Sequence, residues 1–161
     1  MKIAIIGCSE SHDLAPWDDS TWIKWGLRQD NRYWAWFDLM FEIHDKDMLV
    51  SLGKWDKAKE RISLTKAITR EDYGLNSEIY PLLDIFSQFG EYLTSSVAYM
   101  LALAIHKNAS HIGIWGVEMN EDQYFHQRPN FEYLIGFAKG KGIKVTIPDA
   151  CPLLKAPLYG I

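Results

Sequence analysis

Side chains that could bind a ligand or move a proton gather in short polar segments, most of which follow an apolar run. The first such segment consists of Gly7, Cys8, Ser9, Glu10 and Ser11. It contains a single glycine, so it is neither a dinucleotide-binding fingerprint nor a Walker A loop. Its N–H groups and hydroxyls could still bind a phosphate or a sugar, or the segment is a tight turn that needs glycine. Cys8 could be a nucleophile, but no partner is evident and a small packed thiol is the simpler interpretation.

Three consecutive hydroxyl residues, Thr94, Ser95 and Ser96, precede a stretch that is expected to be helical. The first N–H groups of a helix are unpaired and carry the positive end of its dipole, so they bind anions. One hydroxyl is enough to cap a helix. The segment therefore predicts either a phosphate site or a cap with two incidental neighbours.

Two residues are candidates for acid–base chemistry. Glu118 follows an apolar run, where its carboxylate could bind a ribose hydroxyl, act as a base, or belong to a solvated acidic loop. His44, at the end of another apolar run, is the best acid–base candidate among the histidines. The acids near Glu118 lack the spacing of known metal sites, and no metal is expected.

Arg128 lies at the predicted start of a helix, where its charge opposes the dipole. This placement favours a bound anion, although a salt bridge with Glu132 would also explain it. Five of the seven tryptophans lie between residues 17 and 36 and could stack on a base or fill the core. The remaining candidate ligand contacts are Gly116, Val117, Met119, Tyr124 and Gln127.

Hydrophobic patterning predicts the elements that would position these groups. Buried strands are expected at residues 3–6, 39–43, 111–115 and 143–147, and helices at residues 81–89, 97–106 and 129–138. Residues 13–30 read as an irregular, partly helical excursion, 31–38 as a helical turn, 46–70 as one or two solvated helices with a short strand near 62–67, and 71–80 as a loop.

Strands that alternate with helices predict a three-layer α/β, Rossmann-like fold with a mainly parallel sheet. We expect one such domain over residues 1–161. Ligands of these sheets bind beyond the carboxyl ends of the strands, where the strand order reverses. The polar segments therefore converge on one rim of the sheet.

Composition excludes several classes of protein. Hydrophobic residues make up 48% of the 161 residues and charged residues 24%, which is typical of a globular protein. The net charge of −4 disfavours generic nucleic-acid binding. Only two cysteines, no apolar run of transmembrane length and too short an apolar start for a signal peptide predict a cytoplasmic protein.

Four segments together resemble a family of small proteins that bacteriophages encode, a family that brings no established activity. They are residues 41–45, 92–105, 114–119 and 127–136. The resemblance covers nearly the whole chain and implies a location in the host cytoplasm. That family usually has Asp where this chain has Glu118, which implies that an acidic residue is required at this position.

Two shorter segments resemble families with known chemistry. Residues 94–118 are similar to the nucleotide-binding half of bacterial sialyltransferases and of archaeal pterin pyrophosphokinases. This resemblance implies phosphate contacts by Thr94, Ser95 and Ser96, and nucleoside contacts by Gly116 and Glu118. Residues 132–145 resemble the last helix and strand of nucleoside deoxyribosyltransferase-like proteins, but Leu134 stands where that family has its glutamate.

The sequence thus predicts a protein that binds a nucleotide or nucleotide sugar, and an enzyme of glycosyl-transfer type that acts on nucleotides or DNA bases. His44 would be the acid–base group, Glu118 would contact the ribose or an acceptor proton, and Tyr124 or the tryptophans would stack on the base. One alternative is a non-catalytic module that captures a nucleotide signal or binds a host protein. Another is a hydrolase of N-glycosidic bonds. The sequence identifies no cofactor and leaves the oligomeric state open.

Overall fold

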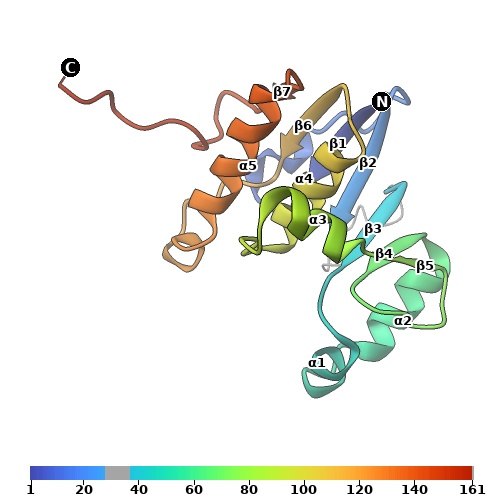
Figure 1. The fold of residues 1–161 in the computed structure, drawn as a ribbon. Helices are drawn as coiled ribbons and strands as arrows, with labels where there is room; N and C mark the ends of the chain where they lie inside the picture. The colour runs from blue at the N-terminus through green and yellow to red at the C-terminus, as the bar shows by residue number, and fades with distance from the viewer. Residues whose placement is uncertain (28–36, 161) are drawn as a thin grey trace.

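A sheet of seven parallel strands forms the centre of the computed structural model, which describes residues 1–27 and 37–160 (Figure 1). The strands are β1 (Lys2–Ile6), β2 (Trp22–Leu27), β3 (Leu39–Glu42), β4 (Ala67–Thr69), β5 (Ser77–Ile79), β6 (His111–Trp115) and β7 (Lys144–Thr146). The helices are α1 (Lys46–Ser51), α2 (Trp55–Leu64), α3 (Leu82–Phe89), α4 (Ser96–His106) and α5 (Arg128–Gly140). Among the described residues, two 3-10 turns span Glu10–Leu14 and Asp122–Tyr124. The predicted α/β, Rossmann-like fold with a parallel sheet is confirmed.

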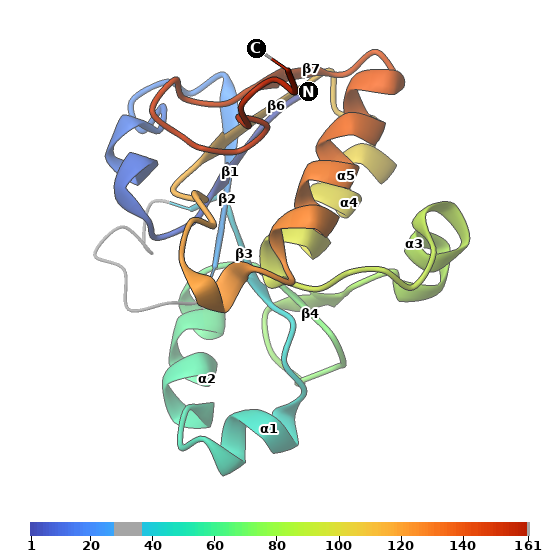
Figure 2. The same cartoon turned by 90° about the vertical axis from the view of Figure 1, so that its left-hand side faces the viewer.

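Alternate residues of β1 face opposite layers, as the period of a strand requires. Ile3 and Ile5 pack with residues of α3, α4 and α5, whereas Ala4 and Ile6 pack with residues of α1 and α2. Figure 2 shows α4 and α5 side by side on one face of the sheet. Both faces of the sheet are therefore covered, which explains why β1 and β6 read as continuous apolar runs.

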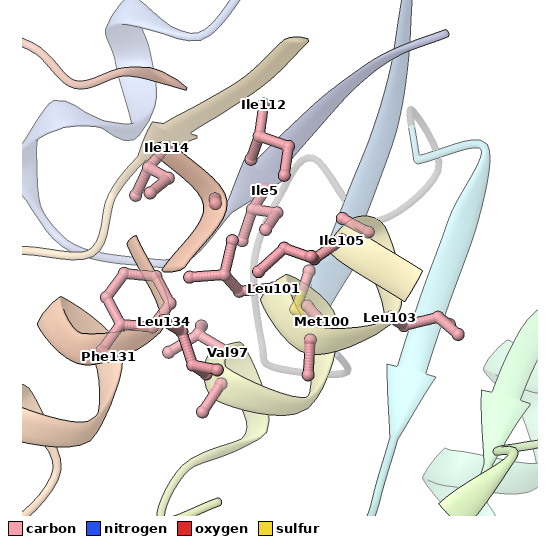
Figure 3. Packing of buried hydrophobic residues seen from close by; sticks show 14 of the residues in the cluster. Ile5, Val97, Met100, Leu101, Leu103, Ile105, Ile112, Ile114, Phe131 and Leu134 are labelled. Carbon is pink, nitrogen blue, oxygen red and sulfur yellow. The ribbon is translucent and has the colours of Figure 1, made fainter. Parts of the chain in front are cut away.

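Helix α4 is apolar around almost its whole circumference because it is enclosed. It contacts β1, β2 and β3 beneath it and α3 and α5 at its sides. Figure 3 shows its Val97 and Leu101 beside Phe131 and Leu134 of α5, with Ile5 of β1 nearby. Since a packed core tolerates little change in volume, this enclosure fixes where the helix begins at the rim of the sheet.

The structure corrects the sequence-based elements in three places. Residues 22–27, expected to be irregular and partly helical, form β2 in the middle of the sheet, where Trp22 and Trp25 are buried. The segment expected to be a loop contains β5, a three-residue edge strand with two exposed positions. Helix α2 continues to Leu64, so the strand expected near residues 62–67 begins only at Ala67. The helical turn expected at 31–38 lies mostly outside the described residues.

The order of the strands, β5-β4-β3-β2-β1-β6-β7, reverses at β1. From β1 the chain builds outward to β5 on one side, then returns to place β6 and β7 on the other. The switch point thus lies between the carboxyl ends of β1 and β6, which is where open parallel sheets bind their ligands. Within residues 1–27 and 37–160, no helix combines the length and the apolar character that crossing a bilayer requires.

Candidate functional site

A pocket of about 260 Å³, here called the central pocket, opens at this switch point. Segments that lie far apart in the sequence line it together: the loop after β1, His44 beyond β3, the start of α4 and the loop after β6. The lining residues are Gly7, Cys8, Ser9, Leu27, His44, Ser95, Ser96, Val97, Gly116, Val117, Met119, Tyr124 and Gln127. The structure therefore brings together most of the residues that the sequence singled out.

Two glycines let the loops after β1 and β6 approach each other behind this pocket. A Cβ atom at Gly7 would stand 2.1 Å from the carbonyl oxygen of Gly116, which is backbone and cannot turn aside. Gly116 itself has a φ of +65°, a conformation that glycine adopts without strain. The N–H of Ser9 donates to the Gly116 carbonyl at 3.0 Å. The glycine in the first polar segment therefore serves close backbone contact.

The three hydroxyl residues at the start of α4 make different contacts. Ser95 is the N-cap, and its Oγ accepts from the N–H of Ala98 at 3.2 Å. Thr94 points to α5, where its Oγ1 donates to Asn130 Oδ1 at 3.3 Å, and it does not line the central pocket. Ser96 lines the pocket, and its hydroxyl makes no hydrogen bond to any residue the structure describes. Ser96 is therefore the hydroxyl left for a ligand.

His44 is paired with a buried carboxylate that sequence analysis did not single out. Nδ1 of His44 lies 2.6 Å from Oε1 of Glu42, whose side chain is only 3% exposed. Glu42 is the last residue of β3, two positions before His44, so a strand period places both side chains on the same side of the chain. A carboxylate on one ring nitrogen of a histidine fixes the proton there and leaves the other nitrogen for a ligand.

A second and larger pocket of about 650 Å³ adjoins the central pocket and shares Cys8, Ser9 and Tyr124 with it. We call it the acidic pocket. Its other lining residues are Glu10, His12, Asp13, Glu118, Asn120 and Glu121. No three His, Cys, Asp or Glu side chains in the described part of the chain are grouped closely enough to hold a metal ion.

Glu118 is one of the residues that line the acidic pocket, and it is only 7% exposed. Its Oε1 accepts from the N–H of Ser11 at 3.0 Å, which ties the loop after β6 to the loop after β1. Its Oε2 is buried and has no hydrogen-bond partner among the residues that the structure describes. Cys151 lies close enough that the Glu118 charge adds to burial in raising the pKa of its thiol.

Three other candidates lie outside both pockets. Ser11 is buried, and its Oγ accepts from the N–H of Gly116 at 2.8 Å. Thr94 is joined to Asn130, as described above. Arg128 is engaged by Glu132 Oε1 at 2.9 Å and by the carbonyl of Pro152 at 2.6 Å. These three residues hold loops and helices together, and the salt-bridge interpretation of Arg128 matches its contacts.

The tryptophans that the structure describes pack in the core and line neither pocket. Trp25 is 3% exposed and packs on Phe41, with ring centroids 5.2 Å apart. Trp22 meets Trp115 edge to face. Of the aromatic candidates, Tyr124 is the one that both pockets share, and Trp34 and Trp36 lie outside the described residues.

Sequence analysis did not single out several residues that line the two pockets, nor Glu42, which supports His44. Leu27 and Val97 read as ordinary core residues, and His12, Asp13 and Asn120 as loop residues without a role. For Glu42 a signal was present: an acid in an otherwise apolar strand, two positions before a histidine.

Comparison with known proteins finds the same fold. The structure is similar to the sialyltransferase CstII from Campylobacter jejuni in complex with the substrate analogue CMP-3FNeuAc, with a TM-score of 0.57 at 13% identity, over 94% of this chain and 80% of CstII. CstII in complex with cytidine-5'-monophosphate gives a TM-score of 0.59 at 14% identity, over the same shares of the chains. CST-II with a trisaccharide acceptor and CMP gives 0.56 at 12% identity, over 94% and 82%. No family model and no curated protein matches the sequence.

Proposed function

We propose that the protein binds a nucleotide sugar in the central pocket and transfers its glycosyl group to an acceptor. The observation that carries this proposal is the convergence of Ser96, His44 and the loop after β1 on one pocket at the switch point of the sheet. The fold shared with a sialyltransferase that has been solved with CMP supports it.

The start of α4 is the proposed phosphate site. The first N–H groups of a helix have no partner inside it and lie at the positive end of the helix dipole. Ser95 satisfies one of these groups, and the Ser96 hydroxyl stands beside the others at the edge of the pocket. A phosphate placed there would gain charge-assisted hydrogen bonds from these groups. None of the described residues that line the central pocket is Lys or Arg.

Glycosyl transfer then needs two proton movements, for which the two pockets provide one group each. The bond from the anomeric carbon to the phosphate oxygen breaks, and the nucleotide leaves with its electron pair. His44, held by Glu42, would give a proton to that phosphate. The acceptor oxygen bonds to the anomeric carbon and loses its proton to Glu118. Tyr124, which lines both pockets, would contact both substrates.

The acceptor is expected to be a small molecule. The chain carries a net charge of −4, and none of the described residues that line the acidic pocket is a Lys or Arg that could pair with a phosphate backbone. Bases within DNA are therefore not proposed as acceptors.

Incubation with CMP, UDP and GDP sugars, followed by mass spectrometry of every product, tests the proposal. We expect release of free nucleotide from one class of donor, and loss of that release in His44→Ala. Ser96→Ala should weaken binding of the donor about tenfold, since it removes a hydrogen bond to a charged group. Ser95→Ala is the variant to compare with Ser96→Ala. It removes the helix cap and should lower the free energy of unfolding by about 1 kcal/mol.

Other products would contradict glycosyl transfer. Stabilisation by a nucleotide that is recovered intact, with every donor unchanged, would indicate capture. Release of a free base would indicate hydrolysis of an N-glycosidic bond.

A further inference from the structure

We infer that the acidic pocket is a binding site for a polyhydroxylated small molecule that carries a positively charged group, such as an amino sugar or an amino polyol. The inference rests on the proposed function in that this molecule would be the glycosyl acceptor. It is carried by the composition of the pocket, by one buried carboxylate oxygen, and by the position of the pocket beside the proposed donor site.

The buried oxygen is Oε2 of Glu118. A carboxylate oxygen that is withdrawn from water without a hydrogen bond costs free energy, and proteins rarely leave one in this state without a reason. Oε1 of the same group is already occupied by the N–H of Ser11. Glu118 lines the acidic pocket and not the central pocket. A hydroxyl or ammonium group bound against Glu118 in the acidic pocket would supply the missing donor.

The carboxylates around the acidic pocket favour a ligand with a positive charge. Glu10, Asp13 and Glu121 stand at exposed positions around it, and none of the described residues that line it is Lys or Arg. Nε2 of His12 lies 3.3 Å from Oδ1 of Asp13, so the imidazole faces one of these acids. Carboxylates gathered around a concave surface concentrate cations and repel anions.

The size of the pocket indicates an organic molecule. Its volume of about 650 Å³ lies within the range of about 300–1,000 Å³ that is usual for small-molecule sites. Cys8, Ser9 and Tyr124 line both this pocket and the central pocket. Two substrates bound in adjoining pockets would be held close together, as a transfer between them requires.

Three probes that differ in a single group test the inference: 1-amino-1-deoxysorbitol, sorbitol and gluconate. Each is titrated into the full-length protein, and backbone amide shifts are followed by NMR spectroscopy. We expect the amine to shift the amides of residues 10–13 and 118–121, and to bind about fivefold or more tightly than sorbitol because of its charge. Gluconate should bind least.

Two variants separate the charge from the buried oxygen. The double variant Glu10→Gln/Glu121→Gln changes exposed positions and should bring the affinity of the amine close to that of sorbitol. Glu118→Gln should weaken both probes, since a neutral amide accepts hydrogen bonds less strongly. Glu60→Gln, on the exposed face of α2, is the matched control and should change neither.

Equal affinity for all three probes would overturn the inference, as would amide shifts that fall outside the acidic pocket or an amine affinity that survives the double variant. A parallel titration with CMP keeps this result distinct from the proposed function. If CMP does not bind and no donor is turned over, while the amine binds as expected, the proposed function fails and the cation site remains.

Discussion

At the scale of single residues, the pairing of His44 with Glu42 gives the central pocket its chemical character. A histidine that is half exposed at the end of a strand would otherwise carry its proton on either ring nitrogen. The buried Glu42 carboxylate, 2.6 Å from Nδ1, favours the form with the proton on that atom. Nε2 then has a lone pair when the ring is neutral and a proton when it is charged, as an acid–base group needs.

Glu42→Gln tests this pairing. An amide can donate as well as accept, so it no longer specifies which nitrogen of His44 carries the proton. We expect kcat to fall at least about tenfold with KM little changed, as for other carboxylate–histidine pairs. The nitrogen NMR signals of the neutral His44 ring should show the proton mainly on Nδ1 in the natural protein and a mixture in Glu42→Gln.

The variant Glu42→Asp should restore part of the activity because it keeps the carboxylate. Unchanged imidazole signals in Glu42→Gln would show that Glu42 does not set the protonated nitrogen.

At the scale of elements, the site depends on how closely the loops after β1 and β6 approach. Gly7→Ala places a methyl group against the Gly116 carbonyl, and Gly116→Ala forces an alanine to a positive φ. We expect each to lower the free energy of unfolding by about 2–3 kcal/mol in chemical denaturation.

Gly136→Ala in α5 is the matched control, because nothing lies within 4 Å of the added Cβ atom. It should stabilise the protein by about 0.5–1 kcal/mol through helix propensity. A fully stable Gly7→Ala variant would contradict the close packing of the two loops.

The junction of β6 and β7 gives the protein a pH dependence that is separate from the site. Nε2 of His111 lies 2.8 Å from the hydroxyl of Thr146, and its ring packs on Trp22. Burial, together with the charges of Lys144 and Lys2, lowers the pKa of His111 below 6.5. As the pH falls below about 6.5, the unfolded chain binds a proton at His111 more readily than the folded chain does. The free energy of unfolding therefore falls as the pH falls.

Urea unfolding between about pH 7.5 and 5.5 should therefore show a smaller loss of stability for His111→Gln than for the natural protein. The glutamine can still bond to Thr146, so the comparison at the higher pH serves as the control. An identical loss in both proteins would show that another group is responsible.

At the scale of the whole molecule, the sequence predicts the rim of the sheet better than its edges. The strands around the switch point are apolar runs closed by glycine, and α4 is apolar on all sides, so their positions can be predicted. Strand β2 was not predicted because Lys24, Gly26 and nearby Pro16 interrupt its apolar pattern. In the structure, Nζ of Lys24 donates to the carbonyl oxygens of Asp19 and Trp22, so the charged group has partners in the buried strand. The short strand β5 has too few buried residues to leave a signal.

The candidate site was predicted to the extent that it follows from topology. The rule for parallel sheets places the loops after β1, β3 and β6 and the start of α4 at one rim, and these loops line the central pocket. The role of each side chain depends on contacts across the chain that no spacing reveals. Thr94 bonds to Asn130 and Arg128 to Glu132, whereas Glu42 supports His44.

The most direct test of the account is a titration of the protein with CMP, UDP and GDP in turn, one of which should bind, followed through its backbone amide signals. We predict that the amides of residues 7–9, 44, 95–97 and 116–119 shift together with one dissociation constant, because segments distant in the sequence meet at a single phosphate-binding rim. Signals that do not move, or shifts confined to one of these segments, would contradict it.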